Sequence, residues 1–231
     1  MSKKKSPNKK RDALITSILI MFLYFIWPYL IEVVLGPLEL KDNLSLCCTF
    51  IGNFILFIII IYTYYKDFLN DFKDLKINKK KLLIGLKAFI IGLVLYVGLN
   101  AILKLGVNLE QDNTNAMLNV YSKIPVLFVF ASVFYYPIIE EIVFKKTFKE
   151  FITNKWLFVV VTGFITAFFT LALSLNSITS LLYFIPIAVF SMTFSYIYYE
   201  TDNILVAIFY RILYNVIPSL VALVYGVSML L

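Results

Sequence analysis

Long apolar runs alternate with short polar segments along most of the chain. A helix needs about 20 predominantly apolar residues to cross a bilayer. Residues 13–35, 44–65, 82–103 and 124–144 all reach this length. They predict four transmembrane helices. The first run follows a basic segment like that of a signal peptide. Because no small-residue cleavage site follows the run, we expect it to remain in the mature protein as a transmembrane helix.

The second half of the chain continues this pattern. Residues 156–199 carry no charge and are too long for one span, and the Ser, Asn and Thr residues at 174–179 favour a turn that divides them into two. The last run, 204–231, contains Arg211 and Pro218, and fits either one long kinked helix or a span followed by a re-entrant tail. The pattern predicts an all-α polytopic bundle of about seven spans, with six or eight also consistent.

Basic residues set the expected orientation and domain limits. They concentrate in residues 1–12 and in the predicted connections 66–81 and 145–155, whereas the opposite connections carry few. By the positive-inside rule, these basic segments and the N-terminus are cytoplasmic. We therefore predict a basic tail at 1–12 and a single transmembrane domain at 13–231, with no internal repeat.

Composition supports the membrane class. The 231 residues are 61% hydrophobic and only 15% charged, whereas soluble domains carry about 25% charged residues. The net charge of +7 is concentrated beside the spans, which favours anionic lipid over nucleic acid as the partner. The adjacent Cys47 and Cys48 are interpreted as packing residues rather than a disulfide framework or metal site. Abundant Lys, Asn, Ile, Phe and Tyr indicate an AT-rich bacterial genome, so we expect a bacterial plasma-membrane protein.

Lys87 lies near enough to the start of its apolar run to snorkel outward. Four further charged residues fall within the apolar runs: Glu32, Glu140, Glu141 and Arg211. A charge at the bilayer centre costs about 2.5–3.5 kcal/mol on insertion scales, so such residues normally face the bundle interior and have a partner. Glu141 lies about 6 Å and Arg211 about 12 Å inside the cytoplasmic ends of their helices, from the helical rise. These similar depths predict that Arg211 pairs with Glu140 or Glu141.

Spacing within the helices adds two further expectations. Glu141 and Lys145 are four residues apart and can pair on one face, and Arg211 and Asn215 present to the same neighbour. Adjacent side chains point about 100° apart, so at most one of Glu140 and Glu141 aims directly into the bundle. A simpler interpretation is that the two glutamates only mark the cytoplasmic end of the helix.

The segment Glu140-Glu141-Ile-Val-Phe144-Lys145, preceded by Pro137, resembles the first motif of the CPBP family, Glu-Glu-x-x-Phe-Arg. This family of intramembrane proteases includes CAAX prenyl endopeptidases and bacterial proteins for bacteriocin processing and self-immunity. Lysine stands at the arginine position here. It conserves the charge but lacks the bidentate guanidinium fork.

Two further segments resemble the other motifs of that family. Phe169 through Leu173 matches Phe-x-x-x-His with leucine at the histidine position, and Arg211 through Asn215 matches His-x-x-x-Asn with arginine replacing histidine. The resemblance covers about residues 124–217, which it identifies as a CPBP-like core.

The resemblance implies a site in which Glu140 activates a water and Phe169 has a supporting role. The other residues that the resemblance places in this site are Glu141, Lys145, Leu173, Arg211 and Asn215. The family site is often described as a metal site. Leucine and arginine cannot bind a metal, because neither offers a lone pair, so we expect no cofactor.

These departures favour a catalytically degenerate pseudo-protease that binds a membrane or envelope protein or a peptide, as an immunity or regulatory protein. A glutamate held by a guanidinium is a poor general base. Two alternatives remain open: an active endopeptidase that uses Glu140 to cleave prenylated or leader peptides, and a small transporter-like membrane protein.

Overall fold

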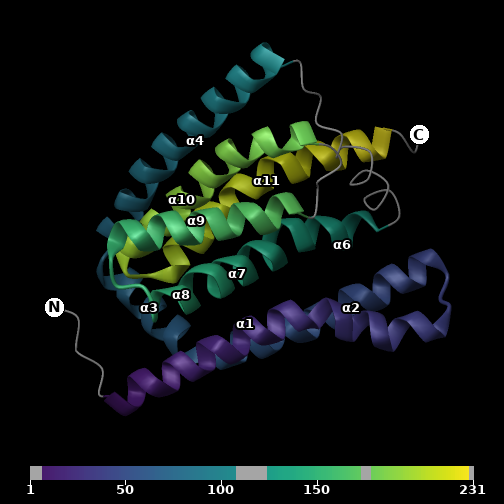
Figure 1. The fold of residues 1–231 in the computed structure, drawn as a ribbon, viewed down its shortest axis with the longest axis horizontal. Coiled ribbons are helices and arrows are strands. Elements are labelled where there is room, and N and C mark those ends of the chain that lie inside the picture. Colours follow the sequence, from purple (N-terminus) through teal and green to yellow (C-terminus); the bar gives the residue numbers. More distant parts are fainter. Residues whose placement is uncertain (1–6, 108–123, 173–177, 229–231) are drawn as a thin grey trace.

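The structure is a computed structural model that describes residues 7–107, 124–172 and 178–228. Within these ranges the chain forms helices and short connections and contains no strand (Figure 1). Several of the helices are long and apolar enough to cross a membrane. The predicted all-α polytopic bundle is therefore confirmed.

Each predicted span corresponds to one helical segment among the described residues. The segments are α1 (Pro7–Leu35), α2 (Asp42–Thr63), α4 (Lys80–Val107), a composite helix from Pro125 to Lys149, α9 (Lys155–Ala172), α10 (Phe184–Thr201) and α11 (Ile204–Ser228). Shorter apolar segments lie within α9, at Lys155–Leu171, and within α11, at Ile204–Leu220. Helix α1 begins inside the predicted tail, and the short 3₁₀ turn η1 (Gly36–Leu38) connects it to α2.

Helix α10 is central to the main body of the bundle. It packs between α4 and α9 and also contacts α11 (Figure 1). Helices α1 and α2 form a hairpin, and both of them contact the composite helix. One face of α10 is buried throughout, from Pro186 to Thr201. The core therefore lies around α10, α11 and the middle of the composite helix.

The composite helix is interrupted by two π-helical segments. It runs through α6 (Pro125–Phe130), π segment η2 (Ala131–Tyr135), α7 (Tyr136–Glu141), π segment η3 (Ile142–Lys146) and α8 (Thr147–Lys149). Pro137 has no N–H to donate to the preceding turn, and in η2 the backbone N–H of Tyr136 bonds to the carbonyl of Ala131. Such π segments are rare and frequently occur at functional sites. Here they flank the two glutamates.

One prediction about the connections was wrong. Residues 66–81 were expected to form a loop, but α3 (Tyr65–Ile77) is helical and joins α2 to α4. Its three aspartates recur at a spacing of four and three residues, so they share one helix face. An amphipathic segment of this kind gives no long apolar run, so the hydrophobic pattern alone does not reveal it.

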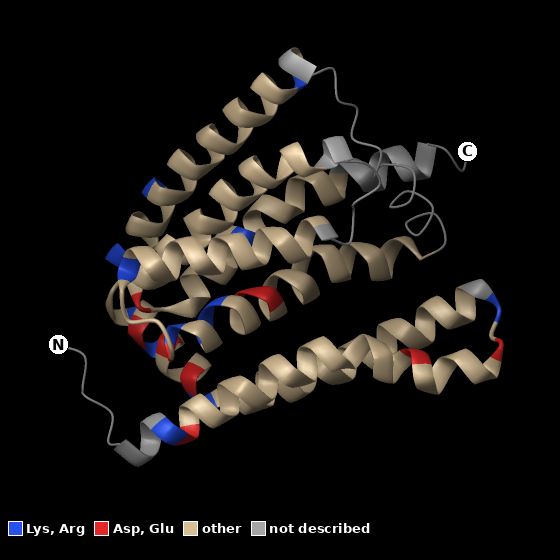
Figure 2. Cartoon of the chain, in the orientation of Figure 1, with Lys and Arg blue, Asp and Glu red and all other residues tan. Residues whose placement is uncertain are grey.

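The last helix settles an open alternative. Helix α11 continues through Pro218 to Ser228 as one helix, rather than a span with a re-entrant tail. Its connection to α10 is very short, and Asp202 adopts a left-handed conformation there with φ of 46°. Charged residues gather at this end of the bundle, around α3, α8 and the α10–α11 turn (Figure 2).

Candidate functional site

Helices α7 and α11 bring Glu140 and Arg211 together. The Arg211 Nη2 atom donates a hydrogen bond to Glu140 Oε2 over 3.1 Å. The side chains are 11% and 20% exposed, respectively, so the pair lies inside the bundle. The predicted contact between Arg211 and one of the glutamates is confirmed, and its partner is Glu140.

The neighbouring glutamate forms a second, deeper ion pair. Glu141 Oε1 accepts from Lys145 Nζ one turn along the same helix, and both side chains are fully buried. The other carboxylate oxygen of Glu141 has no hydrogen-bond partner among the described residues. The expected pairing at a spacing of four residues is confirmed, and the two glutamates therefore have different cationic partners.

An aromatic ring of α10 joins the two cations. The Phe194 ring centroid lies 5.5 Å from Lys145 Nζ and 5.1 Å from the Arg211 guanidinium carbon. Both distances are within the range in which the negative face of a ring attracts a cation. Phe194 was not predicted from the sequence, because it lies in a long uncharged run rich in aromatic residues, where nothing distinguishes this position.

Asn215 contacts the composite helix one turn further along α11. Its side-chain nitrogen donates to the backbone carbonyl of Ser132 over 2.9 Å. The Ser132 hydroxyl in turn lies 3.0 Å from the Ser219 hydroxyl. Arg211, Asn215 and Ser219 are spaced four residues apart, so one polar stripe of α11 faces the helix that carries the glutamates. Ser132 was also missed from the sequence.

The comparison with family models addresses this same part of the chain. The family described as Type II CAAX prenyl endopeptidase Rce1-like matches residues 122–217. This range coincides with the predicted core at 124–217. This segment is therefore similar to CAAX prenyl endopeptidases, which supports the resemblance to the CPBP family. A search of curated proteins and a search of solved structures gave no match.

Within the matched segment, the residues that resemble the first two motifs meet through aromatic contacts. Phe144 stacks on Phe169 of α9 with ring centroids 5.3 Å apart, and Phe25 of α1 lies 4.9 Å from Phe169. Leu173 lies outside the described residues. Glu32 is exposed on α1, so the structure does not bring it to this site.

The donor groups of the matched segment do not fit a metal ion. Glu140 and Glu141 each accept from a cationic side chain, and the arginine at the third motif has no lone pair. The chain contains no histidine. In the part of the chain that the structure describes, no group of three His, Cys, Asp or Glu residues could hold an ion. The arrangement instead holds two neutralised carboxylates around a ring.

Proposed function

We propose that this CPBP-type membrane protein is a pseudo-protease, a catalytically degenerate family member that acts by binding a membrane or envelope protein or a peptide. The observation that supports the proposal best is the ion pair between Glu140 and Arg211. In the family resemblance, Glu140 stands at the position that activates water. Here the same residue is held by a permanently charged side chain.

The chemistry of the pair disfavours hydrolysis. A general base must accept a proton from a water that is positioned to attack the substrate. Glu140 Oε2 accepts instead from Arg211, which cannot release a proton at physiological pH. The second carboxylate is fully buried with Lys145. Both glutamates thus serve as anions that neutralise buried cations.

The remaining motif residues also have structural contacts. Asn215 ties α11 to the composite helix through the Ser132 carbonyl, and Phe169 packs against Phe144. The fold is thus held together by ion pairs and packing, while the donor groups for a metal are missing. This combination is expected when a protein keeps its fold in order to bind a partner. An immunity or regulatory role fits this expectation.

One observation favours the alternative of an active endopeptidase that uses Glu140 without a metal. The Glu140 side chain keeps 20% of its surface exposed, and only its Oε2 atom bonds to Arg211. A water could reach the other oxygen. This alternative predicts cleavage that depends on the Glu140 carboxylate.

An activity assay separates the two functions. The full chain is reconstituted in proteoliposomes with a prenylated peptide or a leader peptide, beside Glu140→Gln, which retains an amide oxygen for Arg211. Glu32→Gln is the matched control, because Glu32 is exposed. We expect no cleavage from any of the three proteins. Cleavage by the wild type and Glu32→Gln, lost in Glu140→Gln, would overturn the pseudo-protease proposal.

Binding is tested separately in nanodiscs. A partner peptide or protein should be retained by the wild type and by Glu140→Gln, because the glutamine amide oxygen can still accept the hydrogen bond from Arg211. Arg211→Ala leaves Glu140 without its cation, and this variant should no longer retain the partner. Equal retention by Arg211→Ala would show that the partner does not depend on this site.

A further inference from the structure

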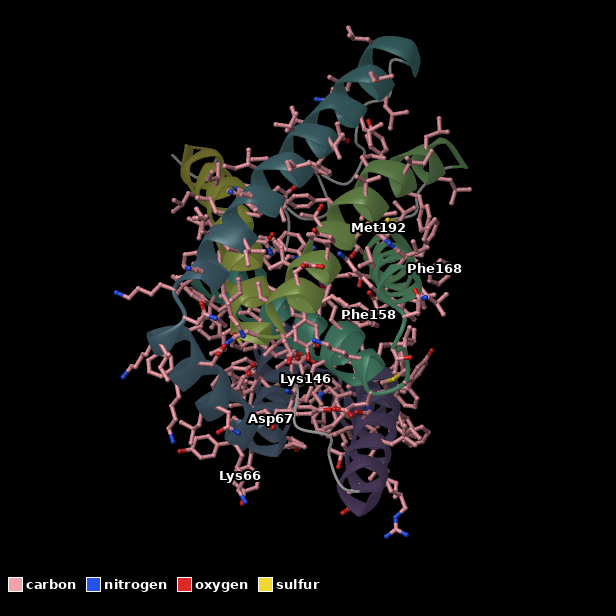
Figure 3. The ribbon with its side chains drawn as sticks, turned by 90° about the vertical axis from the view of Figure 1, so that its left-hand side faces the viewer. Lys66, Asp67, Lys146, Phe158, Phe168 and Met192 are labelled. Carbon is pink, nitrogen blue, oxygen red and sulfur yellow. The ribbon has the colours of Figure 1, made fainter. Side chains whose placement is uncertain are left out.

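Helix α3 directs all of its acidic residues toward the protein. Asp67, Asp71 and Asp74 are spaced four and three residues apart and occupy one face. Asp67 lies 3.0 Å from the ammonium of Lys146, and in Figure 3 these two side chains point toward each other. Asp71 accepts a hydrogen bond of 3.1 Å from the backbone N–H of Ile204. Asp74 lies 2.7 Å from the ammonium of Lys81 and accepts a hydrogen bond of 3.0 Å from the Asn203 side chain.

The opposite face of α3 combines lysines with large apolar side chains. Tyr65, Leu69, Phe72 and Ile77 are exposed. The same face carries three exposed lysines, Lys66, Lys73 and Lys76. None of the three forms an ion pair with a described residue. Figure 3 shows Lys66 pointing away from the bundle, opposite to Asp67.

The lysines and the apolar side chains lie close together on this face. The Lys76 ammonium lies 4.8 Å from the centre of the Phe72 ring. Phe72 is 53% exposed and Leu69 is 40% exposed, although both are large and apolar. Exposed aromatic and aliphatic groups under a layer of ammonium groups are typical of helices that lie in a membrane interface.

The connections of α3 place it at that interface. Tyr64 alone separates it from α2, and Asn78 and Lys79 separate it from α4. Both neighbours are long apolar helices that can cross a membrane. With both ends joined to spans by so few residues, α3 cannot move far from the membrane surface.

We propose that the face of α3 formed by Tyr65, Leu69, Phe72 and the three lysines lies in the headgroup layer of the surrounding membrane and binds anionic lipid. The apolar side chains enter the boundary of the acyl chains, and the lysines bind phosphate groups. The inward aspartates leave the lipid-facing side without negative charge. Each lysine near an anionic surface contributes about a fivefold preference for anionic over neutral lipid.

The experiment uses the full chain with a fluorescent label at position 72. Phe72→Cys is introduced in a Cys47→Ser, Cys48→Ser background, labelled with an environment-sensitive dye, and placed in nanodiscs. The discs contain either phosphatidylcholine alone or phosphatidylcholine with phosphatidylglycerol. Headgroup spin-labelled lipid and a water-soluble quencher report the depth of the dye.

The proposal predicts blue-shifted emission that headgroup spin labels quench, more strongly in discs with phosphatidylglycerol. Replacing Lys66, Lys73 and Lys76 with glutamine should remove the phosphatidylglycerol effect. The matched control replaces three exposed lysines elsewhere, Lys41, Lys87 and Lys104, and should retain it. High salt should weaken the effect in the parent protein, because the attraction falls off within a Debye length.

Two results would overturn the proposal. The first is strong quenching of the dye by the water-soluble quencher, to the same extent in both kinds of disc. That result would show that this face of α3 is in water rather than in the headgroup layer, and it would be available to a protein partner. The second is a phosphatidylglycerol effect of the same size in the glutamine variant and its control. Because labelling does not require the lysine substitutions, misfolding of that variant cannot hide the first result.

Discussion

Arg211 and Glu140 form a 3.1 Å hydrogen-bonded ion pair between α11 and α7, in the positions that resemble the third and first CPBP motifs. Both side chains are largely buried, and the guanidinium also lies over the Phe194 ring. The pair therefore links three helices through one cation. Its energetic importance can be measured because either charge can be removed alone or exchanged with the other.

Removing one charge of this pair should destabilise the protein. Arg211→Ala leaves Glu140 without its cation, and breaking a buried pair in this way typically costs about 3–5 kcal/mol. We expect a clear loss of thermal stability in detergent or nanodiscs. Arg11→Ala is the control, since its ion pair with Asp12 is largely exposed and should matter little.

Exchange of the charges gives a stricter test of the same contact. Arg211→Glu and Glu140→Lys should each destabilise, and the double variant should recover part of the lost stability, because opposite charges again face each other. Thermal unfolding of all four proteins forms a double-mutant cycle. Additive losses in that cycle would contradict an energetic contact between the two residues.

The sequence predicted this contact in part. Helical rise placed Arg211 and the glutamates at similar depth, but adjacent glutamates differ in direction by about 100°. Choosing between them required the rotation of the helix about its own axis. The π segment η2 alters that rotation immediately before α7, and nothing in the hydrophobic pattern reveals it. Depth could be predicted from the sequence, and direction could not.

Other parts of the site show why residue type alone is insufficient. The apolar runs predicted the helices well because a membrane requires long uncharged segments. Phe194 and Ser132 were missed because aromatic and small polar residues are common throughout such segments. Helix α3 was missed because its signal is a difference between two faces rather than a long apolar run. These features depend on how the helices pack.

The fully buried pair of Glu141 and Lys145 should behave differently from a simple stabilising bridge. Both groups lose solvation, and one carboxylate oxygen has no hydrogen-bond partner among the described residues. Replacing such a pair with apolar residues of similar size is often neutral or stabilising by 1–4 kcal/mol, whereas removing one partner destabilises. We expect Glu141→Leu with Lys145→Met to be more stable than either single variant in thermal unfolding. A double variant that is less stable than both would contradict this balance.

Close packing of α4 against α10 depends on Gly92. A Cβ atom at this position would lie 2.7 Å from the Cβ of Thr193, closer than two carbon atoms can approach. Gly92→Ala should therefore force the helices apart and cost about 1–3 kcal/mol of stability. At Gly98 on the same helix, no described atom of a neighbouring element lies within 4 Å of such a position. Gly98→Ala should be neutral or slightly stabilising, and equal effects of the two changes would contradict this packing role.

Asp74 and Asp71 on α3 should give opposite pH dependences. Burial raises the pKa of Asp74, but hydrogen bonds from Lys81 and Asn203 outweigh it, so the pKa lies below its ordinary value. Burial raises the pKa of Asp71 above its ordinary value. The stabilisation from Asp74 is thus present above the unfolded-state pKa of about 3.9 and lost as pH falls through the lower folded-state value.

The sign is reversed for Asp71, because its folded state binds the proton more tightly than the unfolded state. Its contribution to stability therefore falls as pH rises from the unfolded-state pKa of about 3.9 through the higher folded-state value. Asp74→Asn should lower stability at neutral pH by about 0.5 kcal/mol, since the Asp74 side chain is partly exposed, and should remove some of the acid destabilisation. Asp71→Asn should instead be neutral or stabilising at neutral pH, because an amide oxygen still accepts from the Ile204 N–H. Thermal unfolding in nanodiscs between neutral and acidic pH measures both, and parallel pH profiles for the two variants would contradict the opposite shifts.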